Sequence, residues 1–212
     1  MKATKQENHD PSNNQKIVKG GSQVIAEMII KNKLLEPGGH NLLIYKDLKT
    51  LREIYSQYSK ALLPENEIVI IGTQYDPIGY VKNALKSSGR DDDDDVFDGE
   101  RYLNQGTLFI IDAQQEYQED ADHRGMWKLA MSLISRAKKE GRRGVTWFGD
   151  LGSFFSFDKI EDMIEYELWL PQKNEEDTMK SICCYHSKDF GKLNETQQRT
   201  LFDHHLKSIF IE

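Results

Sequence analysis

Short, wholly apolar segments alternate along the chain with longer segments in which apolar positions recur every three or four residues. The first pattern predicts strands that are buried on both faces, and the second predicts amphipathic helices. The expected strands are 42–45, 68–71, 108–112, 145–148, 181–185 and 208–211. Strands alternating with helices in this way favour a three-layer α/β fold, with a mostly parallel sheet between helices. Because the helix before 208–211 is short, we expect that strand to pair antiparallel at an edge.

The domain boundary is expected near the amino terminus. Residues 1–22 are rich in Lys, Asn, Gln, Ser and Gly, a composition typical of a disordered tail. Residues 23–212 then form a single α/β domain that starts with a helix over about 23–35. Asp76 and Pro77 are read as an N-cap and a first helical residue. In the helix after the fourth strand, the apolar stripe is taken to run from Phe157 to Leu168.

The turn after the first strand contains no glycine. Tyr45 leads directly into Lys46, Asp47 and Leu48. Nucleotide-binding α/β domains usually hold phosphate on a Gly-rich loop at this point, because bare backbone N–H groups can approach the anion there. The chain therefore has no Walker A loop, which favours sensing or binding over hydrolysis.

Charge and composition restrict the partners. The chain has 28 basic and 35 acidic residues and a net charge of −7, which argues against a general binder of nucleic acid or anionic membranes. No segment is apolar for the roughly 18 residues that a membrane span needs. Cys183 and Cys184 are adjacent in a predicted strand, so they face opposite ways and form no disulfide with each other. A reducing cytoplasm is the expected location.

The candidate ligand site follows from topology. Parallel α/β sheets bind ligands beyond the carboxyl ends of their strands. The side chains at those positions combine aromatic rings, carboxylates and a histidine, which suits a small, partly apolar ligand. The candidates are Tyr45, Lys46, Asp47, Thr73, Tyr75, Glu116, Tyr117, Asp150, Ser153, Tyr185 and His186. Without a phosphate loop, Asp150 is expected to cap the Gly152–Ser153 turn or to bind ligand.

Other polar groups suggest no catalytic centre, metal site or cofactor. The acidic run Asp91–Asp95 is read as a solvated loop, since a calcium loop interleaves its acids and needs a glycine turn. Cys183 and Cys184 are read as core residues, with oxidation or soft-metal binding as the alternative. His204 and His205 are read as a surface helix end.

Three segments resemble the MEDS domain, a presumed sensory module first described in a regulator of dichloromethane metabolism. They are His-Asn-Leu-Leu-Ile-Tyr at 40–45, Gly149-Asp150, and Cys-Cys-Tyr-His at 183–186. The resemblance covers roughly 37–212 and adds His40 to the candidate site. The MEDS domain is found in methanogens and methylotrophs. The resemblance implies a fold similar to the RecA/KaiC-like ATPase core and a role in sensing small molecules or relaying signals, without known catalysis. Here Asp150 replaces the usual Glu, and His186 replaces the usual Asp.

The hypotheses differ in class. The first is a non-catalytic sensory or signal-relay domain that binds a small molecule at the strand ends. The second is a degenerate RecA/KaiC-like module that docks on a signalling protein or assembles as a homo-oligomer. The third is a residual nucleotide-binding ATPase. Measured hydrolysis that is lost when Asp150 is replaced by Asn would support it.

Overall fold

Seven strands form one sheet, and every neighbouring pair in it runs parallel. The computed structural model describes residues 15–17, 22–31, 35–86, 97–115, 124–173 and 178–211. The order across the sheet is β1-β7-β2-β6-β5-β3-β4. The strands are β1 (Gln15–Ile17), β2 (His40–Tyr45), β3 (Glu67–Thr73), β4 (Leu108–Asp112), β5 (Gly144–Asp150), β6 (Met179–His186) and β7 (Lys207–Phe210).

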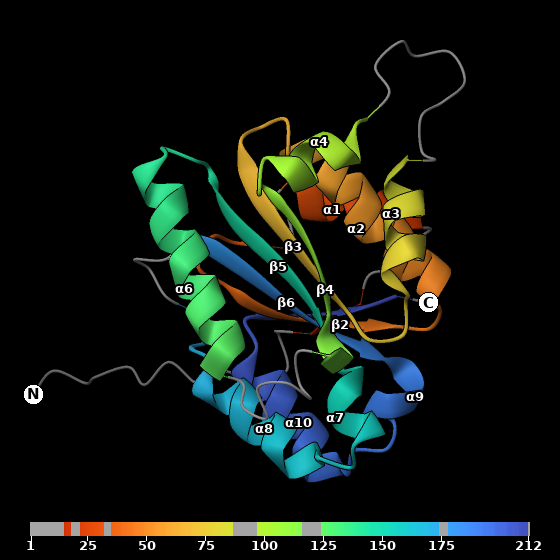
Figure 1. Ribbon diagram of the computed structural model, residues 1–212. Helices are drawn as coiled ribbons and strands as arrows, with labels where there is room; N and C mark the ends of the chain where they lie inside the picture. The colour runs from red at the N-terminus through yellow and green to blue at the C-terminus, as the bar shows by residue number, and fades with distance from the viewer. Residues whose placement is uncertain are drawn as a thin grey trace, which may run out of the picture.

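Helices cover both faces of the sheet, as Figure 1 shows. One face packs against α1 (Ser22–Ile30), α2 (Leu48–Leu62), α3 (Ile78–Lys86) and α4 (Gly99–Asn104). The other packs against α6 (Arg124–Lys139), α7 (Gly152–Ser156), α8 (Ile160–Trp169), α9 (Ser187–Phe190) and α10 (Glu195–His204). The expected three-layer α/β fold with a parallel sheet is confirmed.

Side-chain alternation along β6 decides which face each residue serves. Ile182 and Cys184 join the core under α1, α2 and α3, whereas Cys183 and Tyr185 join the core under α7 to α10. The period of two in a strand requires this division. Both cysteines are buried and carry free thiols. The expectation that they face opposite ways is therefore confirmed.

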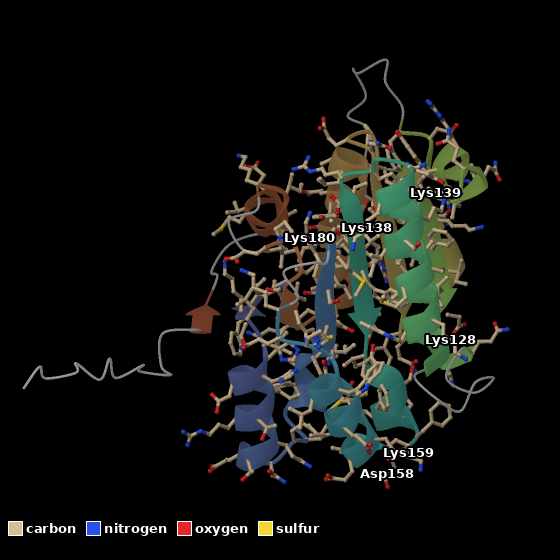
Figure 2. The ribbon with its side chains drawn as sticks, turned by 90° about the vertical axis from the view of Figure 1, so that its left-hand side faces the viewer. Lys128, Lys138, Lys139, Asp158, Lys159 and Lys180 are labelled. Carbon is tan, nitrogen blue, oxygen red and sulfur yellow. The ribbon has the colours of Figure 1, made fainter. Side chains whose placement is uncertain are left out.

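The amino ends of the central strands are joined by a buried polar network. Lys180 Nζ lies 3.2 Å from both carboxylate oxygens of Glu67, and Tyr58 donates a 2.7 Å hydrogen bond to the same carboxylate. The Thr146 hydroxyl also donates to Glu67. Figure 2 shows Lys180 near the start of β6, with Asp158 and Lys159 at the opposite end of the molecule. The network therefore lies far from the carboxyl ends of the strands.

Two expectations about the ends of the chain are wrong. Residues 15–17, assigned above to a disordered tail, form strand β1, whose Ile17 pairs with Phe210. The last strand, β7, is parallel and lies inside the sheet between β1 and β2. The ten residues of α10 are enough to bring the chain back to the same end of the sheet. The first helix begins at Ser22 and ends at Ile30.

Two local expectations are also wrong. In α8 the buried position after Met163 is Glu167, while Leu168 is 46% exposed. Asp76 does not cap α3, because one of its oxygens accepts from Arg52 and Tyr55 and the other has no hydrogen-bond partner. No helix in the described part of the chain is both long and apolar enough to cross a bilayer. The run Asp91–Asp95 lies outside the described residues.

Candidate functional site

The carboxyl ends of β2 and β5 are linked across β6. The Tyr45 hydroxyl donates a 2.7 Å hydrogen bond to Asp150 Oδ2. Both residues point to the same face because Asp150 is opposite Cys184 in β6, and Cys184 is opposite Leu43, two residues before Tyr45. Strand register thus brings together two residues that are far apart in the sequence.

Asp150 is the buried acid at this end of the sheet. Its second oxygen accepts a 2.9 Å hydrogen bond from the Gly152 backbone N–H, so the predicted cap on this turn is confirmed. Burial raises the pKa of Asp150 to about 7, helped by the nearby carboxylates of Asp189 and Asp76 and opposed by the bonds from Tyr45 and Gly152. Burial and Asp150 also raise the pKa of Tyr45, which remains a hydrogen-bond donor. The carboxyl group can therefore gain or lose a proton near neutral pH.

Tyr75 and Gln74 cover the Asp150 turn. The Tyr75 hydroxyl donates a 2.5 Å hydrogen bond to Asp189, and the Ser153 hydroxyl donates one of the same length to Gln74. A Cβ placed on Gly152 would lie 2.5 Å from the Tyr75 ring, so only glycine fits beneath this ring. The segment that joins β3 to α3 thus closes over the strand ends.

A small cavity remains beside Asp150, between the strand ends and α2. Its volume is about 10 Å³, roughly the space one water molecule needs. It is lined by Leu51, Tyr55, Ile71, Gly72, Thr73, Asp76, Phe148, Asp150 and Cys184. One Asp76 oxygen is buried here without a hydrogen-bond partner. The structure therefore has a polar pocket at the strand ends, nearly filled by its own side chains.

The other candidates at this end of the sheet differ in position. Thr73 donates to the Asp76 carbonyl oxygen, and the His186 ring lies 5.3 Å from that of Tyr45. Lys46 is exposed. Asp47 is also exposed and caps α2, accepting 2.8 Å hydrogen bonds from the Thr50 backbone N–H and hydroxyl. Glu116 and Tyr117 lie outside the described residues.

The N-cap of α2 bears on phosphate binding. The link between β2 and α2 is only Lys46 and Asp47, and the Asp47 carboxylate satisfies the N-terminal backbone N–H of Thr50. A phosphate at this helix end would face that negative charge and find the donor already used. The turn therefore offers no cradle of the P-loop kind.

Two of the candidate residues, His40 and Tyr185, lie away from Asp150. They belong to a second cluster of buried polar side chains. His40 is the first residue of β2, about 16 Å along the strand from Tyr45. Tyr185 faces the opposite side of the sheet from Tyr45 and donates to Glu167. Glu167 in turn lies 2.9 Å from His40 and 3.4 Å from His205.

Sequence reasoning missed this second cluster. His205 was assigned to a surface helix end, but it is fully buried beside Glu167 and Cys183. The cluster was missed because its residues are far apart in the sequence and show no spacing typical of metal or ligand sites. One signal was present: Glu167 follows Ile160 and Met163 on the inward stripe of α8, where a carboxylate needs a partner.

Comparison with known proteins identifies a family to which the chain belongs. No curated protein sequence matches the chain. A family model described as "MEthanogen/methylotroph, DcmR Sensory domain" matches residues 39–205, which include β2 to α10 and both polar clusters. The match covers most of the chain and supports the resemblance drawn from the strand-end segments. The chain belongs to the MEDS family of sensory domains.

Proposed function

We propose that this sensory domain binds a small molecule at the carboxyl ends of β2, β3, β5 and β6. The observation that carries the proposal is the Asp150 carboxylate, which is 5% exposed and receives hydrogen bonds from a second strand and from its own turn. Buried acids whose pKa lies near neutrality are enriched at functional sites. The ligand we propose is small, partly apolar and able to hydrogen-bond to Asp150 or Tyr45.

Ligand entry requires the covering segment to move. The cavity of about 10 Å³ is too small for an organic molecule, and the segment that borders it through Thr73 and Asp76 is held by the Tyr75–Asp189 and Gln74–Ser153 hydrogen bonds. We propose that the ligand replaces these two hydrogen bonds and shifts Tyr75 outward. A ligand that binds the open form more tightly than the closed form shifts the equilibrium towards the open form, by as much as the two affinities differ. Ligand binding then changes the shape of the protein surface.

A second protein must receive that signal. We propose that a signalling partner or a second copy of the chain contacts residues 74–76 and responds to their movement. The parallel sheet and the short, glycine-free link after β2 fit descent from a RecA/KaiC-like ATPase that has lost its phosphate loop. The free thiols of Cys183 and Cys184 fit a reducing cytoplasm.

Thermal unfolding in the presence of a library of small organic molecules, with magnesium–ATP included, tests the proposal. A ligand should raise the melting temperature of the protein. The Tyr45→Phe and Asp150→Asn variants should lose most of that rise. Tyr58→Phe is the matched control, because Tyr58 also donates to a buried carboxylate but at the amino ends of the strands.

Two results would refute the proposal. One is a ligand whose stabilising effect is equal in the wild type, Tyr45→Phe and Asp150→Asn, because that ligand would bind elsewhere. The other is ATP hydrolysis that Asp150→Asn abolishes, which would make the domain an enzyme.

A further inference from the structure

The second polar cluster brings together four residues from four elements. His40 is in β2, Glu167 in α8 and Cys183 in β6, and His205 follows α10. One donor atom from each lies within 4.8 Å of all the others, and all four side chains are buried. His40 Nε2 is 3.0 Å from Cys183 Sγ and 2.9 Å from Glu167 Oε2. The cluster is on the opposite face of the sheet from Asp150.

The contact between His40 Nε2 and Cys183 Sγ is a hydrogen bond, but no hydrogen bond accounts for the approach of Glu167 to His205. Glu167 Oε2 and His205 Nε2 are 3.4 Å apart, yet both are buried without a hydrogen-bond partner. His205 Nδ1 lies 2.7 Å from the Leu201 carbonyl oxygen. Because a carbonyl only accepts, Nδ1 carries a proton, and Nε2 faces the carboxylate in one of two forms: with a second proton, as an imidazolium, or with a lone pair that can bind a metal ion. In the second form the lone pairs of Nε2 and Oε2 repel each other at this distance unless a metal cation lies between them.

Surrounding contacts orient the donors. The Leu201 carbonyl fixes the tautomer and ring orientation of His205. The Tyr185 hydroxyl holds Glu167 Oε1, which leaves Oε2 directed at the histidines. Metal-binding histidines and carboxylates usually have such outer partners. His204 is excluded from the cluster because its Nε2 lies 2.8 Å from the Leu170 carbonyl oxygen.

We propose that His40, Glu167, Cys183 and His205 bind one zinc ion. Two imidazole nitrogens, one thiolate and one carboxylate are typical ligands of tetrahedral Zn²⁺. Zinc bonds of about 2.0 to 2.3 Å at tetrahedral angles place the ligand atoms roughly 3.3 to 3.6 Å apart. The 3.4 Å separation between Glu167 and His205 falls within this range, and the separations of 2.9 and 3.0 Å would lengthen by roughly half an ångström on binding.

Charge also favours a divalent cation. A carboxylate and a thiolate together balance Zn²⁺, so the buried site is neutral overall. Zinc displaces the proton of the Cys183 thiol when it binds, because the thiolate is the ligand form. A cavity of about 20 Å³ borders His40 and the exposed Pro171, which gives the ion a route inward.

Metal titration of the full chain tests the proposal. The protein is stripped with a chelator, kept reduced with a phosphine, and titrated with ZnCl₂ against a chromophoric competitor. We expect one equivalent of zinc to bind and the melting temperature to rise. Cobalt(II) in place of zinc should give a thiolate-to-metal charge-transfer band. Tyr185→Phe should weaken zinc binding by roughly 10- to 100-fold and retain the stoichiometry.

The adjacent cysteines supply a matched pair of variants. Cys183→Ser should remove the charge-transfer band and weaken zinc binding on the order of 100-fold or more, exceeding the loss from an outer partner. Cys184→Ser, buried on the opposite face of the same strand, should leave both unchanged. Absence of the cobalt band in the wild-type chain would overturn the proposal even if Cys183→Ser failed to fold. Equal effects of the two serine variants would overturn it as well.

Discussion

The Tyr45 hydroxyl and the Asp150 carboxylate lie 2.7 Å apart although β6 separates their strands. The contact joins β2 to β5 at the carboxyl end of the sheet. Since Tyr45 keeps its proton, Asp150 is the member of the pair whose charge changes near neutral pH. This makes the pH dependence of stability a direct probe of the site.

The contribution of Asp150 to the stability of the fold should decrease as the pH rises towards 7. The pKa of Asp150 is about 7 in the fold and 3.8 ordinarily, so between those values the folded chain holds a proton that the unfolded chain has lost. This contribution is complete below about pH 4 and is lost as the pH passes about 7. The pKa difference corresponds to about 4 kcal/mol. Urea unfolding at several pH values should show a flatter profile for Asp150→Asn.

The control for this experiment is Asp162→Asn, which removes an exposed carboxylate 3.6 Å from Lys159 on the surface of α8. Asp76 and Asp189, the other acids near Asp150, remain in both variants. If Asp150→Asn kept the wild-type slope between pH 4 and 7, the buried acid would not be the titrating group.

Breaking the buried ion pair at the other end of the sheet should cost much more than breaking an exposed one. Lys180 is 4% exposed, and its ammonium group faces a fully buried Glu67. Lys180→Met leaves that carboxylate without a counter-charge and should lower the free energy of unfolding by about 3 to 5 kcal/mol. Lys159→Met, which breaks an exposed pair, should cost less than about 1 kcal/mol. Urea unfolding measures both.

A double variant separates lost charge balance from lost packing. Adding Glu67→Gln to Lys180→Met removes the unpaired charge and keeps an acceptor for the Tyr58 hydroxyl. The double variant should therefore be more stable than Lys180→Met alone. Equal stability would mean that the ammonium group acts through packing only.

Replacing Gly152 should displace the cover of the strand-end pocket. The new methyl group would lie 2.5 Å from the Tyr75 ring and 2.7 Å from Gln74 Cγ. Gly152→Ala should destabilise the fold by about 1 to 3 kcal/mol and change the near-ultraviolet circular dichroism of tyrosine. Gly79→Ala in α3 is the control, since no heavy atom lies within 4 Å of its added methyl. The free energy of unfolding of Gly79→Ala should rise by up to about 1 kcal/mol. Equal effects of the two variants would show that the Tyr75 ring does not restrict position 152.

The Asp47 side chain should contribute to stability through the start of α2. Asp47→Ala removes the acceptor for the Thr50 backbone N–H and should cost about 0.5 to 2 kcal/mol in the free energy of unfolding. Asp47→Asn keeps a capping oxygen and should lose much less. A loss of the same size in both variants would show that charge, rather than the cap, matters at this position.

The central strands and their helices could be predicted because their signals are local. An apolar run such as 68–71 identifies a strand covered on both faces, and the stripe in α2 identifies an amphipathic helix. Strand β1 was missed because three residues, two of them polar, carry no such signal. The direction of β7 depends on how α10 packs, which helix length alone does not determine.

The two polar clusters differ in how far sequence could predict them. Tyr45 and Asp150 follow from the rule on strand ends, since Tyr45 closes a predicted strand and Asp150 lies two residues after another strand of the same parallel sheet. His40, Glu167, Cys183 and His205 share no such rule. Their meeting depends on the packing of α8 and on the end of α10, both set by long-range contacts. The Tyr75 cover was likewise beyond prediction, because its contacts cross from one connecting segment to another.

Strand β6 serves two chemistries in strict alternation: Cys183 and Tyr185 face Glu167, and Cys184 and His186 face the Tyr45–Asp150 side. The register of β6 therefore matters as much as its residue types. Deleting or inserting a single residue ahead of Cys183 would exchange the two sets and strip both clusters of their partners at once. Among relatives, this strand should accept substitutions far more readily than changes in length.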